Sequence, residues 1–258
     1  MISGGQVLFE GEDVLAMNEA QLRQLRWRKI SLVFQSAMNS LNPILTIGEQ
    51  IVDAIQAHQR VKRSDALDRA VALLKLVGID SSRLTSYPHQ LSGGMRQRVV
   101  IAIALALEPP LMLMDEPTTA LDVVVQKEIL HQVSELKEKL GFSILFITHD
   151  LSLILEFSTR IAVLYAGKLM EMAPSQELFH APRHPYTKGL LGSVPSVRGP
   201  RKKLVGISGS PPDMRKLPGG CRFHQRCPSA MDRCRSDVPE LRELGPDHIE
   251  ACHLDSPT

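Results

Sequence analysis

Two short apolar runs with a helical segment between them constrain the fold of this chain more than any other feature. Residues 111–114 read Leu-Met-Leu-Met and residues 144–147 read Ile-Leu-Phe-Ile, without a polar position in either run. Strands that are apolar at successive positions are typical of a parallel sheet covered on both faces, and a parallel pair needs a long crossover, here a predicted helix over residues 123–139. The sequence therefore predicts an α/β fold built on a parallel sheet.

Other periodic segments predict the elements around that sheet. Apolar runs at 7–9 and 30–34 predict two strands, and a run at 161–164 before a turn predicts a further strand pair. Between residues 39 and 107 apolar side chains recur at helical spacing, with Ser64 placed to cap one of the helices. We therefore expect a compact helical insertion over residues 39–107.

The composition and the charge limit the kinds of partner to expect. The 30 Lys and Arg residues nearly balance the 28 Asp and Glu residues, so nothing predicts a nucleic-acid partner. The basic positions at 198 and 201–203 are expected to form a solvated linker. The first residues lack the pattern of a secretory signal, and no apolar run approaches the roughly 18 residues of a membrane span. If the protein works in transport, separate subunits must supply the pore.

Pro and Gly become frequent beyond about residue 191, which predicts loops and turns instead of a core. All four cysteines follow, at Cys221, Cys227, Cys234 and Cys252. Without an export signal they are expected to stay reduced, so the set favours a metal site over disulfides. An iron–sulfur cluster and a structural zinc ion both accept four thiolates. Four free structural thiols are the third alternative.

A Ser-Gly-Gly sequence stands just before a predicted helix. In the run 91–98, Ser92 is suited to cap that helix, and Gly93 and Gly94 let backbone amides approach a ligand closely. The N-terminus of a helix built in this way attracts anions, and phosphate is the expected ligand. Taken alone, the same residues also fit an ordinary junction between a loop and a helix.

Acidic residues and a histidine follow the two apolar runs. Asp115 and Glu116 come directly after residues 111–114, at the end of a strand where open α/β sheets bind ligands. Asp115 is suited to hold Mg²⁺ through its water shell, and Glu116 to deprotonate a water that attacks a phosphoryl group. Asp122 lies just downstream, and His149 follows the next strand. Taken singly, such an acidic pair is also common in a turn and such a histidine in a loop.

In this order the segments resemble the nucleotide-binding domain of ABC transporters, a P-loop NTPase fold, from Val7 to about Gly189. The resemblance implies an ATPase with ATP and Mg²⁺ as ligands. Gln35 is similar to the glutamine that contacts Mg²⁺ and the attacking water, and residues 91–95 resemble the signature motif, which contacts the γ-phosphate held by the opposite subunit. The implied catalytic residues are Glu116, His149 and Gln35, and the implied nucleotide- or Mg²⁺-binding residues are Ser92, Gly93, Gly94, Asp115, Asp122 and Gln35.

The last third of the chain carries a narrower resemblance. His184–Leu191, Gly209–Pro212 and Gly220–Pro228 are similar to the C-terminal extension of dipeptide and oligopeptide permease ATPases, much of which nickel importers share. This resemblance implies an ATPase domain over residues 1–190 and a small Cys-rich extension over residues 191–258. It also favours a [4Fe–4S] cluster over zinc. The implied function is to power the uptake of di- or oligopeptides, with nickel as the alternative cargo.

The resemblance also implies a set of partners. These are a second ABC ATPase subunit in a homo- or heterodimer, two transmembrane permease subunits and, indirectly, an extracytoplasmic substrate-binding protein. The chain is then expected as a peripheral protein at the cytoplasmic face of the cell membrane. A soluble ABC ATPase of DNA repair or translation would share the signature segment but lack the cysteine-containing extension.

One motif of that family is missing from the sequence. The P-loop, Gly-x-x-x-x-Gly-Lys-Ser/Thr, supplies the amides and the lysine that cradle the phosphates. The only Gly-Lys pair in the sequence is Gly167-Lys168. Leu169 follows it in place of Ser or Thr, and Ala162 stands where the motif has its first glycine. In the family the loop lies upstream of the segment that begins here at Gly5. We therefore expect an N-terminally truncated ATPase that is inactive alone, or a partner subunit that supplies its signature motif in trans.

Overall fold

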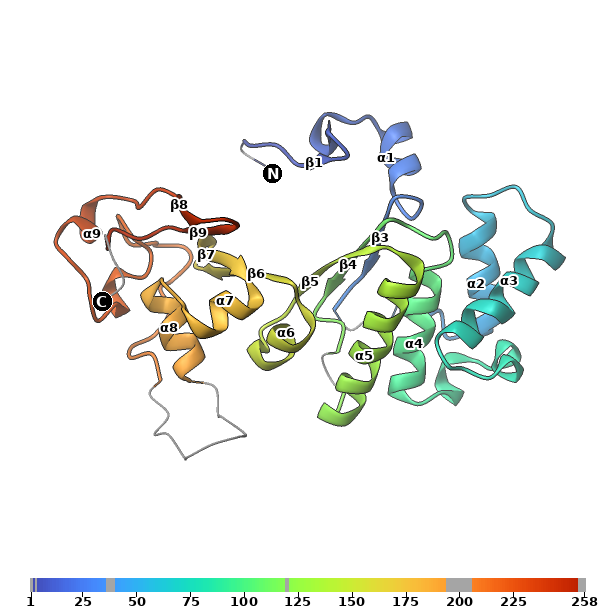
Figure 1. Ribbon diagram of the computed structural model, residues 1–258. Coiled ribbons are helices and arrows are strands. Elements are labelled where there is room, and N and C mark those ends of the chain that lie inside the picture. Colours follow the sequence, from blue (N-terminus) through green and yellow to red (C-terminus); the bar gives the residue numbers. More distant parts are fainter. Residues whose placement is uncertain (1, 3, 36–39, 119–120, 194–205, 255–258) are drawn as a thin grey trace. The chain divides into compact units, whose positions relative to one another are not determined.

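The structure, a computed structural model, describes residues 2, 4–35, 40–118, 121–193 and 206–254 (Figure 1). The chain divides into two compact units, Met1–His149 and Asp150–Thr258. The domain limits expected at residues 190 and 191 stay a prediction, and the basic linker expected at 198–203 lies outside the described residues. None of the helices in the described ranges has the length and apolar character needed to cross a membrane.

A parallel sheet forms the centre of the first unit, as the sequence predicts. Its strands lie in the order β3 (Ile30–Val33), β4 (Leu111–Asp115), β5 (Ser143–Ile147), and the crossover from β4 to β5 contains helix α5 (Val123–Leu140) (Figure 1). Both pairs are parallel, with Val33 opposite Met114 and Asp115 opposite Ile147. The three carboxyl ends therefore lie at one edge of the sheet.

Strand β5 of this sheet has one exposed face within the described part of the chain. Met112 and Met114 of β4 are fully buried in the main hydrophobic core, whereas Leu145 and Ile147 of β5 are 56% and 51% exposed. Side chains alternate between the two faces of a strand, so the exposed pair marks the second face. The expectation that these strands are buried on both faces is therefore wrong for β5 within the described part of the chain.

Helices occupy the segment between β3 and β4, where the sequence predicts a helical insertion. Their bounds are α2 (Ile47–Gln56), α3 (Arg63–Leu76), η3 (Ser81–Thr85), η4 (Pro88–Gln90) and α4 (Gly93–Ala104). Ile47, Ile51 and Ile55 of α2 are fully buried at helical spacing. The expected cap at Ser64 is wrong. Helix α3 already begins at Arg63, and the Ser64 hydroxyl donates to the neighbouring Asp65 carboxylate.

The N-terminal segment forms a small hairpin and a helix. Its elements are β1 (Leu8–Phe9), β2 (Glu12–Asp13), η1 (Val14–Ala16) and α1 (Glu19–Leu25). The strand predicted at residues 7–9 is present, and it pairs antiparallel with β2 in a sheet of its own. The predicted strand at residues 30–34 is the one that joins the parallel sheet.

An antiparallel sheet forms the second unit. Its strands lie in the order β6 (Arg160–Tyr165), β7 (Lys168–Pro174), β9 (His248–Glu250), β8 (Arg242–Gly245). The helices of this unit are α6 (Leu151–Phe157), α7 (Ser175–His180), α8 (Pro185–Gly192), η5 (His224–Arg226) and α9 (Arg233–Ser236). The predicted strand pair around residues 161–164 is confirmed as β6 and β7.

The described part of the Pro- and Gly-rich segment, residues 206–220, contains no helix or strand, as expected, and the residues after it complete a core. Strand β9 pairs with β7, and Phe223 is 1% exposed and packs with Tyr165 and Tyr186. The core of this unit is thus completed by residues that follow the Pro- and Gly-rich segment. Few apolar residues are needed here because aromatic rings bury a large area each.

A buried histidine of strand β9 contacts one carboxylate of strand β7 and one of helix α7. His248 of β9 is 1% exposed, and its Nε2 lies 2.9 Å from Glu171 Oε1 while its Nδ1 lies 2.7 Å from Glu177 Oε1. Glu171 is 0% exposed and also accepts the backbone N–H groups of Arg183 and His184. Each ring nitrogen of His248 therefore faces one carboxylate. This set holds β9 and the segment before α8 on β7.

Candidate functional site

The acidic pair after strand β4 turns away from the sheet through an unusual backbone conformation. Glu116 has a φ of +42°, in the left-handed region that non-glycine residues rarely occupy, and its backbone N–H donates to the Ile147 carbonyl at 2.9 Å. Backbone strain of this kind is concentrated at functional sites. The Glu116 side chain is 24% exposed, so it is partly buried but within reach of solvent.

Three residues of the predicted site meet at the carboxyl ends of the three parallel strands. Gln35 follows β3, Glu116 follows β4 and His149 follows β5. Gln35 Nε2 donates to Glu116 Oε2 at 2.7 Å, and His149 Nδ1 lies 3.0 Å from Glu116 Oε1. Residues that are 81 and 33 positions apart in the sequence therefore orient one carboxylate from two sides.

The surroundings of Glu116 are suited to handling water. His149 faces the Glu116 carboxylate with Nδ1, so its second ring nitrogen, Nε2, is not part of this contact. The His149 side chain is 77% exposed, so it can contact a ligand at the edge of the sheet. Asp115 ends β4 on the sheet face that carries Leu113. The arrangement is chemically able to position a water beside an acidic group.

The signature segment starts helix α4 as predicted. Ser92 is the N-cap, and its Oγ accepts a hydrogen bond from the Met95 backbone N–H at 3.3 Å. Gly94 lies so close to helix α5 that a Cβ there would be 2.9 Å from Val125 Cγ1. Close packing of the two helices therefore requires glycine at this position, in addition to any approach by a ligand.

Asp122 lies beside that segment and not beside Glu116. Its Oδ1 accepts the backbone N–H groups of Val124 and Val125 at 3.1 and 3.0 Å and caps helix α5. A cavity of about 610 Å³ is lined by Ser92, Gly93, Gly94 and Asp122, and its lining includes none of Gln35, Glu116 and His149. The predicted site residues thus form two separate groups within the first unit.

Two further residues of this cavity were missed by sequence reasoning. Arg98 of α4 pairs with Glu128 of α5 at 3.2 Å, and Gly78 has a φ of +68°. A Cβ at Gly78 would lie 3.1 Å from Arg98 Nη1. The detectable signal was glycine two positions after the last residue of helix α3, where a left-handed cap is common.

The four cysteines of the second unit surround one small cavity. Cys221, Cys227, Cys234 and Cys252 are free thiols that line a space of about 10 Å³. Gly220 has a φ of +60°, and a Cβ there would lie 2.4 Å from the Cys234 carbonyl oxygen. The close approach of these two segments therefore depends on that glycine.

Burial favours the neutral form of three of these thiols. It raises the pKa of the Cys221 and Cys227 thiols, and it raises the pKa of Cys252 to about 11. Repulsion from neighbouring cysteines adds to each shift, so the sulfurs interact with one another. No group of three or more His, Cys, Asp and Glu residues in the described ranges is arranged to hold a metal ion. Cysteine sulfurs are the type of ligand that an iron–sulfur cluster or a zinc ion takes. The metal itself stays a prediction.

Comparisons with known proteins agree with these motifs. The ABC transporter family model matches residues 1–119, and the model of the oligopeptide/dipeptide transporter C-terminal region matches residues 170–234. A probable peptide ABC transporter ATP-binding protein of Sinorhizobium fredii is 46% identical over 252 residues, which cover 96% of this chain and 75% of that protein. The chain belongs to the ATP-binding proteins of ABC transporters. It is therefore an ATPase subunit by family.

Further relatives of this ABC ATPase carry similar descriptions. The oligopeptide transport ATP-binding protein AppD of Bacillus subtilis is 46% identical over 93% of this chain and 74% of that protein. The dipeptide transport ATP-binding protein DppD of Escherichia coli is 44% identical over 95% of this chain and 76% of that protein. A solved dimeric bacterial ABC transporter cassette aligns with a TM-score of 0.60 and 31% identity, covering 67% of this chain and 74% of that one. The predicted family and fold are confirmed.

Proposed function

We propose that this ABC ATPase powers the uptake of di- or oligopeptides. The observation that carries the ATPase role is the convergence of Gln35 and His149 on the Glu116 carboxylate. The peptide cargo is supported by the match over residues 170–234 and by relatives described as peptide, oligopeptide and dipeptide transport ATP-binding proteins. Nickel is the alternative cargo.

The geometry supports a division of roles at the strand ends. Glu116 acts as the general base on the attacking water, because it is the carboxylate that two neighbours orient. Asp115 and Gln35 hold Mg²⁺, and His149 contacts the γ-phosphate. When bound, Mg²⁺ neutralises charge that develops on the phosphates. The 258 residues contain no P-loop motif, so residues outside this sequence cradle those phosphates.

The second group of residues acts on a nucleotide held by another subunit. Ser92, Gly93, Gly94 and Asp122 line a cavity that does not include Glu116, so one subunit's two groups serve different nucleotides. This arrangement requires a second ABC ATPase subunit. Two transmembrane permease subunits supply the pore, an extracytoplasmic binding protein delivers the cargo, and the chain works at the cytoplasmic face of the membrane.

The four cysteines are proposed to hold a [4Fe–4S] cluster, with zinc as the alternative. Support comes from their placement around one cavity. The group would cross-link the tail, and the cysteines would lose their protons on binding it. Iron analysis and absorbance near 400 nm on anaerobically purified protein identify the cluster. Protein that contains neither iron nor zinc would carry four free thiols.

The ATPase role is tested by Glu116→Gln in the assembled transporter. Removing a general base commonly lowers a rate by about 10²–10⁴, so we expect at least a 100-fold loss of ATP hydrolysis and loss of radiolabelled dipeptide uptake. Glu138→Gln, at an exposed position of α5, is the control and should retain both activities. Full uptake by Glu116→Gln would contradict the proposal.

Ser92→Arg tests the role in trans. A large cation at this N-cap fills the cavity that is proposed to face the opposite nucleotide. In a 1:1 complex with a second ATPase subunit that has its own P-loop, hydrolysis should fall strongly. If the complex hydrolyses ATP as fast as before, the signature segment of this chain has no part in that site.

A further inference from the structure

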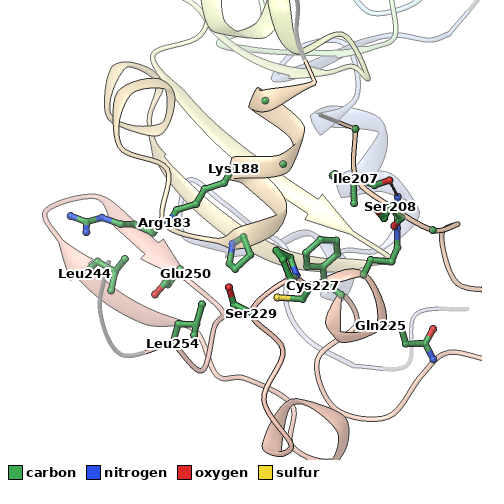
Figure 2. Close-up of a pocket in the computed structure, with 18 of the residues that line it drawn as sticks. Arg183, Lys188, Ile207, Ser208, Gln225, Cys227, Ser229, Leu244, Glu250 and Leu254 are labelled. Carbon is green, nitrogen blue, oxygen red and sulfur yellow. Dashed lines mark hydrogen bonds between the residues drawn. The ribbon is translucent and has the colours of Figure 1, made fainter. Parts of the chain in front are cut away.

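A large cavity in the second unit has no part in the proposed ATPase chemistry. Its volume is about 930 Å³, within the range of roughly 300–1,000 Å³ typical of pockets for small molecules. Helix α8, the segment at residues 206–209, the segment at 223–229 and the β8–β9 hairpin surround it (Figure 2). It lies next to the cysteine cavity and shares Cys227 with it.

Positively charged side chains outnumber negatively charged ones in the lining of this cavity. Its lining contains the cations Arg183, Lys188, Arg226 and Arg242, against the single carboxylate of Glu250. Arg226 is engaged with the carbonyls of the 207–208 segment and with the Tyr165 hydroxyl, and Arg242 is engaged with Glu250 and the Leu254 carbonyl. These two guanidinium groups therefore build the walls.

The other two cations have no such role. Within the described ranges, neither the Arg183 nor the Lys188 side chain has a hydrogen-bond or ion-pair partner, and Arg183 Nε is a buried donor without an acceptor. Figure 2 shows both side chains on the side of the cavity near Leu244 and Glu250. A buried guanidinium donor is unfavourable unless an acceptor reaches it, and a carboxylate matches its geometry best.

Apolar side chains complete the lining. Ile207, Phe223, Leu244 and Leu254 form walls around the space next to the two cations. A ligand that satisfies both parts carries an anionic end and an apolar body. Inorganic phosphate would satisfy only the cations, and a neutral apolar molecule would satisfy only the walls.

We infer that this cavity binds an amphipathic carboxylate, and that its ligand is a short apolar peptide with a free C-terminal carboxylate held by Arg183 and Lys188. The choice of a peptide rests on the proposed function, since the imported cargo then becomes a ligand of the ATPase subunit itself. A fatty acid presents the same chemistry, so the test must distinguish these two sources.

The test is calorimetric titration of the full 258-residue chain with trileucine, with trileucine amide and with dodecanoate. We expect saturable binding of trileucine, at least tenfold weaker binding of the amide, and no displacement of the peptide by equal concentrations of dodecanoate or inorganic phosphate. Equal binding of acid and amide, absence of trileucine binding, or displacement by either competitor would overturn the inference.

Variants locate the binding. Arg183→Gln with Lys188→Gln should weaken trileucine binding at least tenfold, whereas Lys168→Gln, at an exposed cation of β7 outside the cavity, should leave it unchanged. Leu244→Trp, which narrows the cavity without changing charge, should also weaken it. Circular dichroism verifies that each variant is folded, and unchanged binding in both cavity variants rejects the site.

The two proposals fail separately. If Glu116→Gln leaves peptide uptake intact while trileucine still binds, the proposed ATPase role is wrong and the cavity remains a carboxylate site. If Glu116→Gln abolishes uptake but trileucine does not bind, the cavity assignment alone is wrong.

Discussion

Replacing His248 by alanine tests the buried charges that hold the C-terminal strand. The His248 imidazole bridges Glu171 at 2.9 Å and Glu177 at 2.7 Å. Glu171 is 0% exposed and also accepts the backbone N–H groups of Arg183 and His184, so His248→Ala removes the side-chain partner of a buried carboxylate. Removing one partner of a buried ion pair costs about 3–5 kcal/mol, whereas the Glu177 side chain is 41% exposed and contributes little.

A loss of this size is a large share of the roughly 5–15 kcal/mol by which most domains are stable. The chain has two units, so urea unfolding is best followed together with hydrogen exchange in β7 and β9, which reports on the second unit alone. We expect protection of both strands to fall and the unfolding midpoint of this unit to shift to much lower urea.

His131→Ala is the matched control for this prediction. His131 also faces a carboxylate, Glu135 at 3.5 Å, but its side chain is 71% exposed, so we expect a change below about 1 kcal/mol. Equal effects of the two substitutions would refute the reasoning, because the large cost expected at His248 depends on its burial.

Two further predictions concern the same unit. Burial lowers the pKa of His184 from 6.5 to about 4, so the unfolded chain binds this proton first, and stability present above pH 6.5 is lost as the pH falls toward 4. Wild type should therefore lose up to about 3 kcal/mol more than His184→Gln in urea unfolding between pH 7 and pH 4, and parallel losses would exclude this role. Gly220→Ala places a Cβ 2.4 Å from the Cys234 carbonyl oxygen at a φ of +60°, so we expect a loss of at least about 2 kcal/mol and faster labelling of the thiols by a disulfide reagent. Gly245→Ala, where a Cβ meets nothing within 4 Å, is its control, and equal labelling rates would contradict the prediction.

Local patterns in the sequence were enough to predict the parallel sheet, and the family resemblance named the residues at its strand ends as candidate site residues. Each of Gln35, Glu116 and His149 stands one or two positions after a strand, and parallel strands bring their carboxyl ends to one edge. Their convergence follows from topology alone, without knowledge of any side-chain contact. Ser92 as a helix cap was equally local, since the cap and the amide it accepts are three residues apart.

Contacts between distant segments were decided only by the tertiary structure. His248 contacts Glu171 and Glu177, which are 77 and 71 positions away in the sequence. No residue near His248 in the sequence indicates that it is buried beside carboxylates. The cavity beside Arg183 and the exposed face of β5 likewise depend on segments that are distant in the sequence. The sequence by itself determined which segments become strands and which residues stand at their ends, because those properties depend on near neighbours. Burial, ion pairing and cavity shape depend on which remote segments pack together, and so only the folded chain determined them.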